Sequence, residues 1–531
     1  MRAKLSLALV ALLATLCVAG AATAKTKAVA GGNLTVDLTT DVDYTDPALS
    51  YLSTGWELEY ATCLKLMNYP DGIGPRTSQL VPEAAAGFPK VSNNGKTYDF
   101  TIKTDFTKFS DGSKVTPASF KAVFDRVADP KMQSPAGAFM SDIVGANSSP
   151  VTGVKVQGSH LIVTLTHAAP DFLARVAMPF FCAIPAGTAH DPNGVLTPAA
   201  AGPYYIASRV PNKSIVLKRN PYYKGKRPHN ASQITYVVGN SLDATYLRVQ
   251  QGDSDYAAGG IPPAAYAEAA QKYGINKSQF WVKPLLSTAY LAFNTSRGVF
   301  KDNIPLRKAV NQAIDRHALL AQSGFLAGTK TDQILPPGMA GFRDADLYPL
   351  KQPNIKAAQK LAQGHTGDGN VVLYESNRGA SPLRAQIIQF DLKQIGLNVD
   401  VHLFPRAVQL DKEGTRGEPF DIADESWGAD YADPYDFINV LLDGDNIQAS
   451  NNNNFAYFND PKFNQEMLKA SLLSGNARYS AYGNLDVQIM QQAVPWAPRS
   501  NANNRMLVSK RFGCFTYSPI YTVDLAAACL K

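Results

Sequence analysis

The chain has 531 residues and a formal net charge of +7, with 45% hydrophobic and 18% charged residues. This length is too great for one ordinary core, so two or more lobes are expected. The composition excludes a disordered or collagen-like chain. The positive charge is mild and lacks basic runs interleaved with aromatic residues, which leaves nucleic-acid binding without support.

The first 24 residues have the pattern of a secretory signal peptide. Arg2 and Lys4 supply the positive start, residues 5–21 are apolar, and residues 22–24 (Ala-Thr-Ala) form a small-x-small cleavage site. We therefore expect an exported chain that begins at Lys25 and resides in the periplasm or on the outer face of the cell membrane.

A lipid anchor and a membrane span are both disfavoured. Cys17 follows Leu16, whereas a lipidation site needs a small residue before its cysteine, so lipid anchoring is the lesser alternative. No later run reaches the ~18 apolar residues of a membrane-spanning helix.

Four cysteines remain after cleavage of the signal peptide, which suggests two disulfides in an oxidising compartment. Among the three connectivities we favour Cys514–Cys529, a short C-terminal loop, together with Cys63–Cys182; buried free thiols are the alternative. No cysteine has CxxC or Cys/His spacing, so we expect neither a metal nor another cofactor.

The first half of the mature chain predicts strands and one clear helix. Leu34, Val36 and Leu38 alternate as in a strand. Thr116 followed by Pro117 is typical of a helix start, and apolar residues then follow at helical spacing. Further strands are expected from alternation at residues 98–102, 160–166, 214–220 and 234–239.

From about residue 287 onward the pattern alternates between helix and strand, as in an α/β layer. Residues 305–319 predict one amphipathic helix, and residues 381–396 a second that is stopped by Gly396. A strand follows at 397–403, and Asp460 with Pro461 predicts another helix start.

The stretch ESWGADYADPYDF, residues 425–437, concentrates carboxylates and aromatic rings without positive charge: ten Asp or Glu residues lie between Arg416 and Lys462, with no Lys or Arg. A solvated loop is the ordinary interpretation, with Asp433 capping a helix that begins at Pro434. The EF-hand calcium spacing is absent. Catalytic carboxylates remain open, because the sequence cannot show their separation. The residues expected to be solvated are Asp433, Asp436, Asp443 and Asp445.

A pocket for a cation is the sharper interpretation of this stretch. The strand that ends near Trp427 should open at the crevice between lobes, where open α/β sheets bind ligands. Trp427 would offer an apolar wall, and Gly428 would let a ligand backbone approach closely. A carboxylate enclosed there, such as Asp430, must find a cation or hydrogen-bond donors.

Four stretches, taken in order, resemble the extracytoplasmic solute-binding proteins of the dipeptide, oligopeptide and nickel type (family 5), which serve ABC importers. Together they cover about residues 34–510. No single stretch decides the matter, but all four occur in the family order behind a signal peptide. They are YDFTIKTDFTKFSDGSKVTPASF, AAAGPYYIASRVPNKSIVLKRNPYYKG, LAFNTSRGVFKDNIPLRKAVNQAIDR and DIADESWGADYADPYDF.

The resemblance implies a two-lobed, type II periplasmic-binding-protein-like α/β fold with an extra subdomain and two crossover strands, at residues 287–295 and 495–506. Lobe I would comprise residues 25–60, 170–285 and 500–531. The extra subdomain of lobe I would span 61–169, and lobe II would span 286–499.

The resemblance also implies a binding site. In oligopeptide-binding relatives, the Asp of a W-x-x-D-Y motif pairs with the α-ammonium group of the ligand. The matching residues here are Trp427, Asp430 and Tyr431. Tyr51 and Ser53 lie where relatives touch ligand from the facing lobe.

One position departs from the pattern of oligopeptide binders. They can carry an Arg three residues before the Trp, where this chain has Asp424, so the pocket is expected to be more acidic. Arg378 is the candidate for a substitute carboxylate clamp, and a surface arginine is its ordinary interpretation.

The resemblance implies a monomeric, non-enzymatic receptor that binds a small solute, most plausibly a peptide, and delivers it to an ABC transporter permease. A same-fold binder of oligosaccharide or metal chelate is one alternative. A secreted hydrolase of peptides or glycans is the other, although G-x-S-x-G, H-E-x-x-H and P-loop motifs are absent from the sequence.

Overall fold

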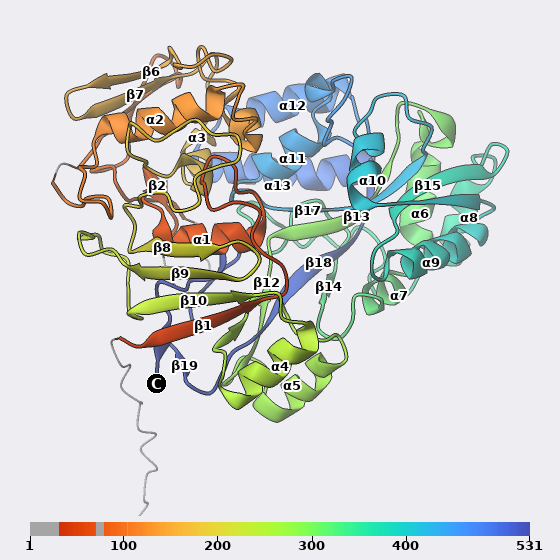
Figure 1. The fold of residues 1–531 in the computed structure, drawn as a ribbon. Helices are drawn as coiled ribbons and strands as arrows, with labels where there is room; N and C mark the ends of the chain where they lie inside the picture. The colour runs from red at the N-terminus through yellow and green to blue at the C-terminus, as the bar shows by residue number, and fades with distance from the viewer. Residues whose placement is uncertain (1–30, 71–78, 104) are drawn as a thin grey trace, which may run out of the picture.

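The computed structural model describes residues 31–70, 79–103 and 105–531. The predicted signal peptide and Cys17 lie outside them. Three larger sheets organise the chain (Figure 1). We call the part built on the five-stranded sheet lobe I and the part built on the seven-stranded sheet lobe II. The four-stranded sheet belongs to the extra subdomain.

The sheet of lobe I joins segments that are far apart in the chain. Its first strand β1 (Asn33–Leu38) runs parallel to both β10 and β11, and Leu34 lies opposite Ile234. Leu34 and Val36 are buried, as their alternation predicts. The remaining strands are β8 (Tyr204–Val210), β9 (Ser214–Arg219), β10 (Gln233–Val238) and β11 (Tyr256–Ala257).

The sheet of lobe II is mixed. Its strand β13 (Ser287–Phe293) pairs antiparallel with both β17 and β18, while β15 and β16 pair parallel. The strands that share this sheet with β13 are β12 (Phe280–Pro284), β14 (Gly328–Lys330), β15 (Asn370–Ser376), β16 (Asn398–Phe404), β17 (Ile422–Gly428) and β18 (Trp496–Leu507).

The extra subdomain packs α2 (Pro117–Ala128) against its sheet. A capping box at Thr116 begins this helix, with Pro117 in its first turn, which confirms the predicted start. The sheet consists of β4 (Lys90–Ser92), β5 (Thr97–Thr101), β6 (Val154–Gln157) and β7 (His160–Thr164).

The remaining helices cover the two lobes. In lobe I and the extra subdomain they are α1 (Ser53–Thr62), α3 (Phe172–Arg175), α4 (Leu242–Gln251) and α5 (Ala265–Tyr273). In lobe II they are α6 (Ile304–Ala313), α7 (Arg316–Ala321), α8 (Ile355–Ala362), α9 (Ser381–Lys393), α10 (Arg406–Glu413), α11 (Tyr435–Leu442), α12 (Pro461–Ser471) and α13 (Gly475–Gln492).

The helix predicted over 305–319 is two helices. The chain leaves helical geometry at Ile314, and the Asp315 carboxylate then caps α7 by accepting hydrogen bonds from the amides of His317 and Ala318. The apolar residues keep helical spacing across this point, so periodicity alone predicts one helix, but the capping residue Asp315 begins a second one. Helices α9 and α12 begin at Ser381 and Pro461, as predicted.

Two strands connect the lobes. β18 pairs with β13 inside lobe II and continues to Leu507 beside β12, after which Val508 bridges to Tyr256 of lobe I. The rings of Tyr290 and Trp496 stack with centroids 3.6 Å apart where β13 and β18 meet. The residue boundaries given above for the lobes stay a prediction.

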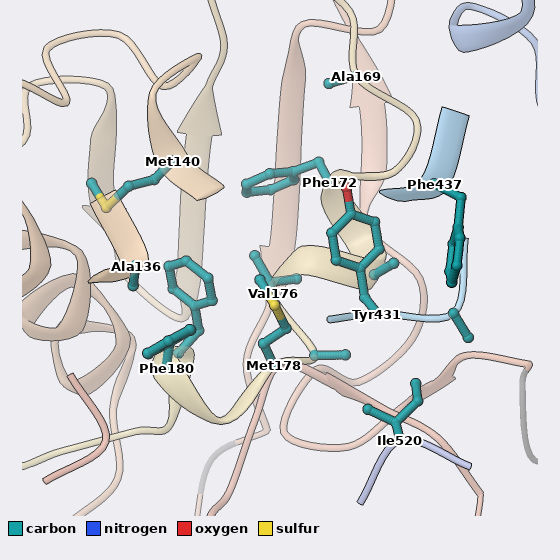
Figure 2. Close-up of a cluster of buried hydrophobic side chains, with 14 of the residues drawn as sticks. Ala136, Met140, Ala169, Phe172, Val176, Met178, Phe180, Tyr431, Phe437 and Ile520 are labelled. Carbon is teal, nitrogen blue, oxygen red and sulfur yellow. The ribbon is translucent and has the colours of Figure 1, made fainter. Parts of the chain in front are cut away.

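The lobes also share one hydrophobic cluster. Figure 2 shows Tyr431 of lobe II lying between Phe172 and Met178 of lobe I and Phe437 of α11. All four side chains are buried. The structure therefore shows the two lobes packed against each other.

The structure joins Cys63 to Cys182 and Cys514 to Cys529, with Cα–Cα distances of 5.2 and 5.4 Å. These are the pairs that the sequence analysis favoured. Among the described residues no helix is both long and apolar enough to cross a membrane, and no group of three or more His, Cys, Asp or Glu is placed to hold a metal ion.

Candidate functional site

The candidate site lies at the end of β17, where that strand gives way to the loop before α11. Gly428 is the last residue of β17 and pairs with Ser287, the first residue of β13. The loop that follows carries Asp430 and contacts lobe I. Both strands therefore bring their ends to the junction of the two lobes.

Asp430 meets Tyr51 across this junction. The Tyr51 hydroxyl lies 3.1 Å from both carboxylate oxygens of Asp430 and donates to them. Tyr51 is held in place by Asp43, whose Oδ2 accepts the amides of Tyr51 and Leu52 at 2.6 and 3.0 Å. The ring centroid of Tyr51 also lies 5.6 Å from that of Phe180. Two residues predicted separately as ligand contacts are thus direct neighbours.

A second carboxylate lies directly behind Asp430. The Asp436 Oδ2 accepts the Trp427 indole N–H at 3.2 Å and the Asp430 amide at 3.0 Å. Asp436 is fully buried, and no described residue donates to its Oδ1. This arrangement fixes Trp427 and the Asp430 backbone against the first turn of α11.

The electrostatics of this pair differ from those of ordinary carboxylates. Burial raises the pKa of Asp430 to about 7, although the hydrogen bond from Tyr51 lowers it. Burial and the adjacent Asp430 charge raise the pKa of Asp436 well above its usual value. No Lys, Arg or His of the described residues forms an ion pair with either carboxylate. The pair can therefore accept a proton or an external cation.

Asp424, expected to make the pocket more acidic, is neutralised inside lobe II. Its carboxylate is buried and pairs with Arg384 at 3.1 Å and Arg499 at 2.9 Å. Although burial opposes ionisation, Arg499 and Arg384 lower the pKa of Asp424. Burial and the Asp424 charge raise the pKa of Glu375 to about 10, although Arg384 at 3.6 Å lowers it. The expectation of extra acidity from Asp424 is wrong, because α9 and β18 supply two guanidinium groups.

The solvated-loop interpretation is wrong for two of its four residues. Asp433 is buried and pairs with Arg478 of α13 at 2.7 Å, while its Oδ1 also accepts the amide of Tyr435 at 2.9 Å. Asp436 is buried beside Trp427. Asp445 is exposed and Asp443 is half-buried.

Tyr431 lies behind the candidate site in this structure. Its ring is only 2% exposed, and its hydroxyl donates to Asp171 Oδ2 at 3.2 Å. The next amide, that of Ala432, donates to the Tyr69 hydroxyl at 3.3 Å. In this structure Tyr431 makes a packing contact that joins the lobes, and its contact with a ligand stays a prediction.

The other predicted site residues are open to solvent. Gly428 is exposed, and a Cβ atom placed on it would meet nothing within 4 Å. Ser53 is exposed at the start of α1, and Arg378 is exposed in the loop after β15. Their contacts with a ligand stay predictions, and the structure does not bring Arg378 into an ion pair with the described residues.

Comparisons with known proteins identify the family of this chain. The sequence profile of the bacterial extracellular solute-binding proteins, family 5 (middle), matches residues 79–449. The chain is 26% identical to the probable D,D-dipeptide-binding periplasmic protein DdpA of Escherichia coli K12 over 427 residues, 80% of each chain. It is also 26% identical over 408 residues to the periplasmic oligopeptide-binding protein OppA of Salmonella typhimurium, covering 71% of this chain and 72% of that one.

Solved structures show the same fold. Clavulanic acid biosynthesis oligopeptide binding protein 2 superposes with a TM-score of 0.85 at 22% identity, covering 94% of this chain and 96% of that one. The DppA protein of Helicobacter pylori in complex with the peptide STSA gives a TM-score of 0.73 at 20% identity, with 94% and 98% covered.

Proposed function

This chain belongs to the bacterial extracellular solute-binding proteins of family 5, and from that premise we propose that it captures a peptide through the peptide's α-ammonium group. The ammonium would bind the Asp430 carboxylate between the lobes, with the Trp427 indole as the adjacent wall. Two of the relatives compared above are named as dipeptide-binding or oligopeptide-binding proteins, and these names support a peptide as the ligand.

The observation that carries this proposal is a buried pair of carboxylates that receives no cation from the described residues. Asp430 is 8% exposed and Asp436 is fully buried, yet within the described part of the chain the side-chain hydrogen bond to Asp430 comes from the neutral hydroxyl of Tyr51. Burial of a carboxylate is costly unless a cation or several donors compensate it. An ammonium group would supply both the charge and three donors.

Capture would act by population shift. The ligand contacts groups on both lobes, Tyr51 on lobe I and Asp430 on lobe II, and so favours the arrangement in which they approach each other. β13 and β18 are the strands about which such a closure would pivot.

The bound peptide would be released unchanged to an ABC transporter permease in the membrane. The protein would act as a monomer and as a receptor rather than an enzyme, since its chemistry consists of ion pairing and hydrogen bonding. Mass spectrometry of the peptide recovered after incubation should show the starting mass only; hydrolysis products would identify an enzyme instead.

The test of the ammonium assignment compares free and N-acetylated trialanine by titration calorimetry. The parent should bind trialanine and bind the acetylated form about a hundredfold more weakly, since loss of a charge-assisted hydrogen-bonded pair costs about 2–3 kcal/mol. Asp430→Asn should weaken binding of free trialanine by the same factor.

The matched control is Asp445→Asn, which changes an exposed carboxylate of the same lobe and should leave affinity unchanged. Equal affinity of the parent for the free and acetylated peptides would overturn the proposed role of Asp430.

A further inference from the structure

Helix α9 is apolar on two opposite faces, which is unusual for a helix at the surface of a protein. One face buries Ala385, Ile388 and Leu392 in the core of lobe II. The other face exposes Leu383 by 52% and Phe390 by 67%. A helix that packs on one side only should be polar on the other.

The outer face of α9 lines a groove with α7. Its residues Leu383, Ile387 and Phe390 follow helical spacing and form one continuous stripe, and Ala318 of α7 and Gln322, which follows α7, also line the groove. An apolar stripe that spans two turns of a helix fits one amphipathic helix laid along it.

The groove is also acidic. Asp391, which is only 3% exposed, lines the groove, and so does Asp315, the N-cap residue of α7. The Asp391 Oδ2 accepts the Asp315 amide at 2.7 Å, while no described residue donates to its Oδ1. Burial raises the pKa of Asp391 to about 6, against that hydrogen bond. No Lys or Arg of the described residues lines the groove, so this largely buried carboxylate receives no cation from the described part of the chain.

The helix that lines the groove also contacts the strand that carries the candidate ligand site. Arg384, the neighbour of Leu383 in the first turn of α9, reaches back to Asp424 of β17, three residues before Trp427. One turn of helix thus presents an apolar side chain to the outside and a guanidinium group to the strand that carries the site.

We infer that the groove between α7 and α9 docks a cationic amphipathic helix of the membrane partner, with leucine-like residues against Leu383 and Phe390 and a Lys or Arg side chain at Asp391. Only the identity of the partner rests on the proposed import function. The chemistry of the docked segment follows from charge complementarity with the two groove carboxylates.

The first experiment uses a fluorescein-labelled amphipathic helix made only of leucine and lysine, and measures its anisotropy with the purified protein. The parent should bind it, and Phe390→Ser should weaken binding about tenfold or more because an aromatic anchor is lost. Asp391→Asn keeps an oxygen for the Asp315 amide and should also weaken binding. Added salt should reduce affinity for the parent.

Leu468→Ser is the matched control. Leu468 is an apolar residue of α12 in the same lobe, 56% exposed, and its change should leave binding intact. Equal binding of a leucine–glutamate helix, or no loss in the two groove variants, would overturn the proposal. A dimer of the parent that Phe390→Ser dissolves would also overturn it, since the occupant would then be a second copy.

The second experiment measures uptake of labelled trialanine by cells that carry each variant in place of the parent. Both groove variants should transport about tenfold less, while their purified forms bind trialanine as tightly as the parent. Unchanged uptake, or affinity that falls in parallel with uptake, would overturn the docking role. The leucine–lysine experiment involves no transported peptide, so its failure is distinguishable from failure of the proposed function.

Discussion

The buried carboxylate of Asp424 and the buried pair Asp430 and Asp436 lie close together along the chain, and their negative charges are balanced in different ways. Asp424 on β17 has two guanidinium partners, from Arg384 and Arg499. Among the described residues, Asp430 and Asp436, in the loop and helix that follow, accept hydrogen bonds from Tyr51, the Trp427 indole and a backbone amide. The charge of Asp424 is balanced within the protein, and the charge of the second group is not balanced by any described residue.

This difference distinguishes a structural carboxylate from a binding carboxylate. Both groups are buried, so burial alone does not identify the ligand site. The deciding feature is whether the fold supplies the opposite charge. For Asp424 it does, through a helix and a crossover strand, and that carboxylate belongs to the framework of lobe II.

The largest expected effect is on stability. Arg499→Met leaves Asp424 with one of its two guanidinium partners, and an incompletely compensated buried charge is strongly destabilising. We expect the free energy of unfolding to fall by about 3–5 kcal/mol, measured by urea denaturation. Arg343→Met, at an exposed arginine of the same lobe, should change it by less than about 0.5 kcal/mol. Equal stability of the two variants would mean that Asp424 is not held by Arg499.

The next effect is on the pH dependence of binding. Asp430 has a pKa raised to about 7, so it is ionised above that pH and protonated below it. Affinity for trialanine should therefore fall as the pH decreases from about 7, by about tenfold per unit. It should also fall above about pH 8, where the α-amino group of the peptide loses its proton.

Asp430→Asn should remove the acidic limb of this profile and keep the basic one. Calorimetric titrations across pH 5 to 9, to be run at about 25 °C, measure both limbs. An acidic limb that persists in Asp430→Asn would assign the titration to another carboxylate.

The smallest effect is expected from Tyr51→Phe. The Tyr51 hydrogen bond lowers the pKa of Asp430, so its loss should move the acidic limb upward by about half a pH unit to one unit, as expected for one hydrogen bond. The ring is retained, and with it the contact to Phe180. A downward shift would contradict the donor role of Tyr51.

The neighbourhood of Asp430 could be predicted in part because Trp427, Gly428 and Asp430 come from one short motif. The resemblance also placed Tyr51 on the facing lobe, and its hydroxyl lies 3.1 Å from the Asp430 carboxylate. Whether these residues contact a ligand stays a prediction. Gly428 is open on one side, as a close approach of ligand requires. These positions follow from where a strand ends, and strand ends are visible in the sequence.

The partners of the carboxylates could not be predicted, because they come from elsewhere in the chain. Arg499 reaches Asp424 from β18 and Arg384 reaches it from α9, and no periodicity in the sequence links them. Asp436 was expected in solvent because a first-turn carboxylate normally is. Tyr431 is buried since the loop after β17 turns into the facing lobe, where strand alternation no longer applies.

The prediction of the fold was also better for local features than for features that depend on other parts of the chain. Strands and capped helices were predicted at their observed places, as at Thr116 and Asp460, because these signals are local. The break at Asp315 was missed because its capping role depends on the chain leaving the helix one residue earlier. The groove beside α9 was also missed, since an apolar residue on a helix does not reveal which face the core will use.

The position of β1 has a consequence for how the chain acquires its structure. This first strand lies between β10 and β11, which are synthesised long after it. Side chains of the C-terminal segment then pack into the same hydrophobic core. Pairings between such distant segments form slowly, because a large loop must close before any contact compensates the lost entropy. Lobe I should therefore mature late, which suits a polypeptide that has to remain threadable until it has crossed a membrane.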